Sequence, residues 1–124
     1  MNDIHRFEPL WDEWKVDELL GEGSFGKVYK VHKTVMNTTY YSAVKHISIP
    51  ANAAELHSIY VEGYANDEES ARAFYANMIV SLSREVDTMY QLRGHTNIVS
   101  YEDHKIIPKD DMPGYDILIR MELL

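Results

Sequence analysis

The sequence predicts an α+β fold, in which three strands, one long helix and two further strands follow one another along 124 residues. Two observations carry this prediction. Five short runs are rich in β-branched and aromatic residues, and one longer stretch repeats apolar residues at three- and four-residue steps. A hydrophobic fraction of 45% suffices for one packed core, and the absence of cysteine excludes disulfides and thiolate zinc sites.

Three strands are expected before the long helix. The first covers residues 14–20 and runs into a glycine cluster, the second covers residues 27–35, and the third covers residues 39–49. Residues 36–38 contain an asparagine and are predicted to form the turn between the second and third strands. Because the connections are short, the three strands are expected to pair as an antiparallel meander.

A short helix and then a long amphipathic helix are expected next. Residues 51–65 are predicted to hold the short helix, which Gly63 would close. The long helix has Asn66 or Asp67 as its N-cap, and Gly94 is expected to end it. A helix face of this length needs cover, either from the preceding segment or from a partner protein. Its apolar residues are Ala71, Phe74, Tyr75, Met78, Ile79, Leu82, Val86, Met89 and Tyr90.

Two further strands are expected after the long helix. They cover residues 97–107 and 115–124, and residues 109–114 are predicted to form the turn between them. The order of elements along the chain is therefore three strands, the helical region and two strands.

The charge balance and the apolar runs exclude several classes of partner. Twelve basic and 20 acidic residues give a formal net charge of −8, which argues against a nucleic acid or an anionic membrane as the main partner. No signal peptide or membrane span is expected, because the chain has neither a basic start nor a long apolar run, and a cytoplasmic location is predicted. The histidines lack the paired spacing of metal ligands, so no metal site is expected.

Gly21, Gly23 and Gly26 form a G-x-G-x-x-G cluster, in which glycines allow backbone N–H groups to approach phosphate oxygens closely. A dinucleotide-binding fold requires a following helix and an acidic residue about twenty positions on, whereas this chain has a predicted strand and Lys45. A P-loop requires a hydroxyl after its lysine, where this chain has Val28. A glycine-bearing hairpin that binds nothing is the third alternative.

The cluster and three later segments together resemble the protein kinase family. GEGSFGKV matches the family's G-x-G-x-x-G-x-V, and Ala43-Val44-Lys45 matches the end of V-A-I-K, with Ser42 in place of the leading valine. Residues 84–99 resemble the family's helix C and the segment after it, and residues 117–124 resemble the fifth strand and the hinge. Four matches in the right order make the resemblance specific.

The resemblance covers residues 14–124 and implies the N-terminal lobe of a kinase, with residues 1–124 as one unit. That lobe is a five-stranded antiparallel sheet with a long helix C. Residues 1–13 would be a leader, and residues 54–75 would be an insertion before and into helix C that serves as a candidate regulatory surface. The chain would end at the hinge, with the C-terminal lobe absent.

An ATP site is implied by the same resemblance. Lys45 would bind the α- and β-phosphates, and Glu85 would hold the lysine by an ion pair. Glu85 follows the apolar Leu82 by three residues, so it is expected to point inward, where an unpaired charge would be costly. The implied ATP-binding residues of the glycine loop, the adenine pocket and the hinge are Leu20, Gly21, Gly23, Ser24, Gly26, Val28, Ala43, Met121, Glu122 and Leu124.

The resemblance implies a protein serine/threonine kinase, which transfers the γ-phosphate of ATP to protein hydroxyls with the help of Mg²⁺. The sequence has neither H-R-D-x-x-x-x-N nor D-F-G, so the base and the Mg²⁺ ligands are expected outside this chain, which alone should be inactive. The implied partners are ATP and, in the complete enzyme, a protein substrate. Apolar surface at the hinge and along helix C would favour self-association. The alternative is a non-catalytic pseudokinase or protein-interaction module that retains this lobe.

Overall fold

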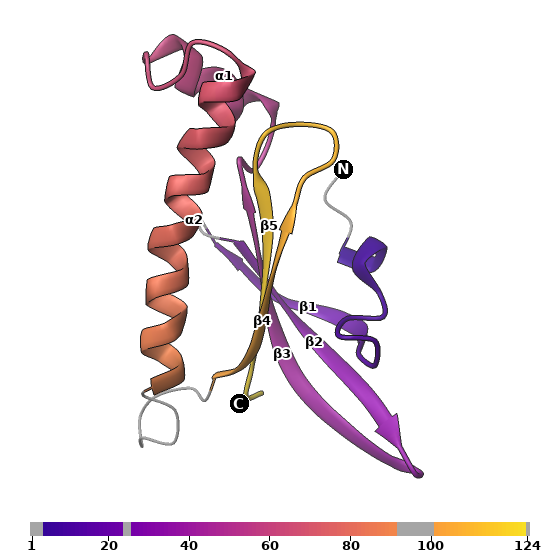
Figure 1. Ribbon diagram of the computed structural model, residues 1–124. Coiled ribbons are helices and arrows are strands. Elements are labelled where there is room, and N and C mark those ends of the chain that lie inside the picture. The colour runs from indigo at the N-terminus through magenta and orange to yellow at the C-terminus, as the bar shows by residue number, and fades with distance from the viewer. Residues whose placement is uncertain (1–3, 24–25, 92–100, 124) are drawn as a thin grey trace.

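Figure 1 shows the fold in a computed structural model, which describes residues 4–23, 26–91 and 101–123, with residues 85–91 described by their backbone alone. Within these residues the chain has five strands and two α-helices, so the predicted α+β class is confirmed. The strands form one antiparallel sheet in the order β1-β2-β3-β5-β4. The elements are β1 (Lys15–Gly23), β2 (Gly26–Val35), β3 (Thr38–Ile49), α1 (Ala53–Val61), α2 (Glu68–Gln91), β4 (Tyr101–Pro108) and β5 (Tyr115–Met121).

β1, β2 and β3 form the predicted antiparallel meander. β1 extends further than predicted, because its pairing with β2 continues through the glycine cluster as far as Gly23. Met36 and Asn37 form the turn between β2 and β3, with φ angles of 49° and 69° that are typical of a two-residue type I′ turn. β5 ends at Met121, three residues before the predicted end, and lies between β3 and β4 in the sheet.

One face of the sheet, which we call the front face, is covered by α2 (Figure 1). Phe74, Ile79 and Leu82 of α2 are partly buried against the core on this face, as their helical spacing predicted. Tyr115 and Met121 of β5 pack against the same core. The residues buried in this front core are Ile49, Ile59, Ala65, Ala71, Tyr75, Tyr101, Ile117 and Ile119.

α1 belongs to the front core and covers the N-terminal part of α2. The side chain of Asn52 caps α1 by accepting a hydrogen bond of 2.8 Å from the Glu55 backbone, and Gly63 follows the helix with a φ of 83°. Ile59 of α1 is 7% exposed and Tyr75 of α2 is 1% exposed within the same cluster. The preceding segment therefore covers the start of the apolar face of the long helix, whereas Met78, which was expected on that face, is 38% exposed.

α2 begins at the predicted N-cap. The Asp67 carboxylate accepts a hydrogen bond of 2.8 Å from the Ser70 backbone, and this bond lowers the pKa of Asp67. Gly94, which was expected to end the helix, lies outside the described residues. Among the helices of the described residues, none combines the length and apolar character that crossing a membrane requires.

Residues 4–14 cover the opposite face of the sheet, which we call the rear face (Figure 1). Residues 1–13 were expected as a leader, but their described part contains a short 3₁₀ helix at Ile4–Phe7 and packs closely against the strands. Ile4, Leu10 and Trp14 are 3%, 1% and 4% exposed. The residues buried in this rear core are Ile4, Leu10, Trp14, Tyr29, Val31, Val44 and Leu118. The sheet is therefore the middle of three layers.

Candidate functional site

The glycine cluster forms the end of the β1–β2 hairpin, which we call the glycine hairpin. Gly21 pairs with Val28, and Gly23 pairs with Gly26. The motif therefore joins two antiparallel strands, and a strand follows it as the sequence predicted. A dinucleotide-binding motif and a P-loop would both open a helix instead. Ser24, the candidate residue between these glycines, lies outside the described residues.

Gly26 is needed where the glycine hairpin approaches β3. Its φ is 138°, a backbone angle that residues with a side chain rarely adopt. A Cβ atom built at Gly26 would lie 2.3 Å from the His46 carbonyl oxygen. Gly21 differs, because a Cβ atom there would have no neighbour within 4 Å. Contacts within the protein thus explain the glycine at 26 but leave open space beside the glycine at 21.

Four of the candidate residues share the front face of the sheet. Val28 on β2 pairs with Lys45 on β3, and Ala43 on β3 pairs with Met121 on β5. Directly paired residues of antiparallel strands lie on the same face, as do residues two apart on one strand. We call Val28, Ala43, Lys45 and Met121 the Lys45 face.

The four side chains differ in burial. Ala43 is 5% exposed, whereas Val28, Lys45 and Met121 are half-buried. The small Ala43 side chain is therefore the most deeply buried of the four. Leu20 is 47% exposed and falls at a register shift of β1, beside Gly21.

The two hinge candidates lie beyond the end of β5. Glu122 is exposed and follows Met121 directly. Leu124 lies outside the described residues.

The expected partner of Lys45 is Glu85 on α2. The side chain of Glu85 lies outside the described residues, so the ion pair stays a prediction. Leu82, three residues before Glu85, packs against the front core. Among the ion pairs between described residues, none includes Lys45.

An open hollow of about 510 Å³ continues the front face along the β2–β3 hairpin. Lys30 lies in its wall and pairs directly with Ala43, so the hollow begins beside the Lys45 face. The Lys30 ammonium lies 4.8 Å from the centre of the Tyr41 ring. Sequence reasoning missed this hollow, because the hollow forms only once β1, β2 and β3 are paired. Its lining residues are Asp17, Glu18, Lys30, His32, Thr34, Thr39 and Tyr41.

A polar contact on the rear face explains the serine that departs from V-A-I-K. Ser42 is 2% exposed and donates a hydrogen bond of 2.7 Å to the Glu102 carboxylate. The same carboxylate accepts a hydrogen bond of 3.0 Å from the Arg120 guanidinium, which also lies 5.0 Å from the Trp14 ring. Ser42 therefore belongs to the layer that holds residues 4–14, on the side of the sheet away from Lys45.

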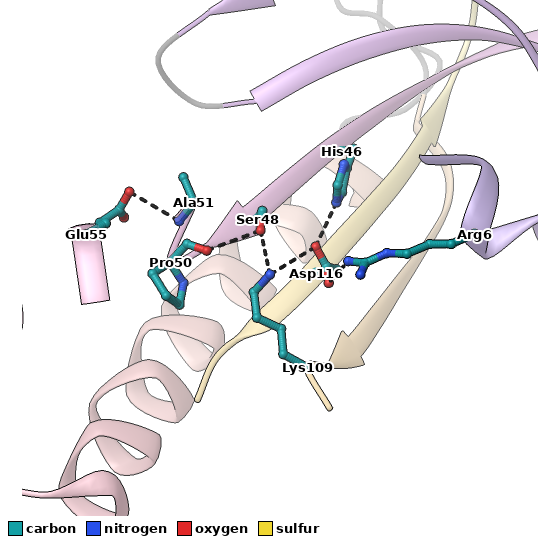
Figure 2. Close-up of polar contacts among 8 residues, drawn as sticks. All are labelled: Arg6, His46, Ser48, Pro50, Ala51, Glu55, Lys109 and Asp116. Atoms are coloured by element: carbon teal, nitrogen blue, oxygen red, sulfur yellow. Dashed lines mark hydrogen bonds and ion pairs between the residues drawn. The ribbon is translucent and has the colours of Figure 1, made fainter. Parts of the chain in front are cut away.

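A second rear cluster surrounds Asp116 (Figure 2). The Asp116 carboxylate contacts His46 Nε2 at 2.8 Å, an Arg6 nitrogen at 3.0 Å and Lys109 Nζ at 3.5 Å. Lys109 also donates a hydrogen bond of 2.7 Å to Ser48. Burial by itself raises the pKa of Asp116, but the His46 hydrogen bond and the charges of Lys109 and Arg6 outweigh it and lower that pKa.

Sequence reasoning missed this cluster because its members are far apart in the chain. Arg6 and Asp116 are 110 residues apart, and neither belongs to a recognisable motif. Across the described residues, no group of three or more histidine and acidic side chains has a metal-binding arrangement.

Comparison with known proteins gives no independent assignment. No protein-family model matches the sequence, and no curated protein matches it either.

Proposed function

We propose that this chain is the ATP-binding lobe of a protein serine/threonine kinase. The observation that carries the proposal is the Lys45 face, because residues from three separated motifs meet there beside the glycine hairpin. The strand order of the sheet and the long helix across its front face are compatible with such a lobe.

The shape of the Lys45 face suits a flat base with a phosphate chain. Ala43 is small and buried, so an adenine ring can approach the strand backbone closely there. Val28 offers apolar contact on one side of Ala43, Met121 pairs with Ala43 on the other, and the exposed Leu20 precedes Gly21 at the edge of the site. The open space beside Gly21 leaves room for phosphate oxygens near the backbone of the hairpin.

Charge supports the same ligand. The chain has a net charge of −8, yet Lys45 places a half-buried cation on the same face as Val28 and Ala43. A half-buried ammonium group favours an anion, and a phosphate group is an anion of suitable size. When bound, Mg²⁺ would neutralise the phosphates further, through ligands that the family supplies from motifs outside these 124 residues.

Titration of the purified chain with ATP, followed by calorimetry, tests the proposal. We expect saturable binding that Lys45→Met weakens at least about tenfold, since a charge-assisted contact to phosphate is lost. Lys105→Met is the matched control, because Lys105 is an exposed lysine on β4 that pairs with Leu118 of the rear core. Its affinity for ATP should equal that of the wild type.

Two further measurements complete the test. Ala43→Leu should block the adenine position and weaken ATP and adenosine alike, whereas Lys45→Met should weaken ATP much more than adenosine. We expect no phosphate transfer by the 124-residue chain alone. Equal ATP binding by the wild type, Lys45→Met and Lys105→Met would refute the site and favour the non-catalytic alternative.

A further inference from the structure

The rear face of the strands that carry the Lys45 face holds a buried charged cluster that ATP binding does not use. The side chains of Asp116, His46 and Lys109 are 3%, 4% and 6% exposed. Burial of so many charged and polar groups is costly unless each finds a partner, so the cluster constrains the elements that supply its members.

The cluster joins residues 4–14 to the two strands of the Lys45 face. Arg6 comes from the N-terminal segment, His46 from β3 and Asp116 from β5 (Figure 2). Phe7 also belongs to the junction. The centres of the Phe7 and His46 rings are 5.6 Å apart in an edge-to-face arrangement, and the Arg6 guanidinium carbon lies 4.6 Å from the centre of the Phe7 ring. The N-terminal segment therefore contacts His46 through an aromatic ring and reaches its partner Asp116 through a charge.

His46 connects this rear junction to the front face through the backbone of β3. It follows Lys45 directly on β3, and its side chain points to the rear face while that of Lys45 lies on the front. Its carbonyl oxygen is the atom against which Gly26 of the glycine hairpin packs. A shift of the His46 backbone would thus move Lys45 and the hairpin together.

We propose that His46 is a positioning residue, through which the docking of residues 4–14 on the rear face holds the glycine hairpin and Lys45 in place on the front face. The expected consequence is tighter ATP binding when residues 4–14 are docked, and this consequence rests on the proposed function. Undocking of the segment removes the Phe7 ring from His46 and the Arg6 charge from Asp116, which loosens the packing behind the position next to Lys45.

Three substitutions within the N-terminal segment test the coupling. Arg6→Gln removes the charge that reaches Asp116, and Arg6→Lys retains it. Glu13→Gln is the matched control, because it removes another ion pair of the same segment, 3.3 Å from Lys33, which is far from His46 in the sheet. Hydrogen exchange of the backbone amides at 21–28 and 43–46 and the dissociation constant for ATP are measured for each variant.

Arg6→Gln should speed exchange at both stretches and weaken ATP binding at least about fivefold, a typical size for coupling between two sites. Glu13→Gln should leave both quantities at their wild-type values, and Arg6→Lys should recover most of the loss. In a His46→Leu background, Arg6→Gln should add no further effect on exchange. Should that background fail to fold, the three single variants still decide the question.

A merely structural role for the cluster would give a different result. Arg6→Gln would then lower the melting temperature while exchange at 21–28 and 43–46 stayed unchanged, and this outcome would overturn the proposal. The exchange data also separate this inference from the proposed function. If the wild type did not bind ATP but Arg6→Gln still loosened both stretches selectively, the coupling would stand and the ATP site would fall.

Discussion

Substitution of Gly26 by alanine should destabilise the fold strongly, whereas the same change at Gly21 should not. At position 26 an alanine meets two costs: a φ of 138° and a Cβ only 2.3 Å from the His46 carbonyl oxygen. The backbone strain costs about 1–3 kcal/mol and the overpacking against β3 a similar amount, so the free energy of unfolding should fall by about 4 kcal/mol. This is a large fraction of the stability of a small domain.

Gly21 offers the matched control within the same motif. A Cβ atom there has no neighbour within 4 Å, so Gly21→Ala should change the free energy of unfolding by less than about 0.5 kcal/mol. Urea unfolding of both variants, followed by circular dichroism, measures the difference. If Gly26→Ala were as stable as Gly21→Ala, the close approach of the glycine hairpin to β3 would be wrong.

The pair also separates folding from ligand binding. If ATP binds as proposed, a methyl group added at Gly21 would meet its phosphates rather than the protein, because the space beside Gly21 is open. Gly21→Ala should therefore weaken ATP binding without loss of stability. Calorimetric titration of the folded variant measures this effect.

Three further variants test the two cores. Asp116→Asn should lower the free energy of unfolding by about 3 kcal/mol at neutral pH, because the charges of Arg6 and Lys109 lose their buried partner. The pKa of Asp116 is lowered on folding, so the carboxylate contributes fully above its ordinary value of 3.8 and its contribution is lost as pH falls below that value. Urea unfolding from pH 7 to pH 2 should show a flatter decline for the variant. Tyr75→Phe should be neutral or stabilise by about 1 kcal/mol, since no described residue bonds the buried hydroxyl. Burial, Glu55 and Tyr60 raise the pKa of Tyr75, so the wild type should lose stability as pH rises above 10, and the variant should lose less. Ile59→Ala should cost about 2–4 kcal/mol and speed hydrogen exchange in the first turns of α2, and unchanged exchange there would contradict the role of α1 as its cover.

Local patterns predicted the elements of the fold well. The alternation in β2 is matched by the burial of Tyr29 and Val31 in the rear core, and the helical spacing of α2 is matched by Ala71 and Tyr75 in the front core. These features depend on residues within a few positions of one another, so the sequence displays them directly.

Long-range pairing limited what could be predicted of the site. Register alone brings Met121 opposite Ala43, and the hollow beside Lys30 follows from the same pairing. The rear layer escaped prediction because nothing near Arg6 in the sequence indicates that its partner is Asp116, 110 residues away. The sequence showed Ser42 only as a departure from V-A-I-K, whereas the structure shows that its hydroxyl bonds the Glu102 carboxylate on the rear face.

The central place of β5 has a consequence for biosynthesis. Ile117 and Ile119 of this strand are buried in the front core, and Leu118 is buried in the rear core. Neither core can close on a nascent chain until residue 121 has left the ribosome, and until then β3 presents an unpaired edge to other chains. The yield of folded protein should therefore depend on how fast the residues between β3 and β5 are translated and on whether chaperones bind β3 meanwhile. This dependence should be stronger than in a sheet whose neighbouring strands follow one another along the chain.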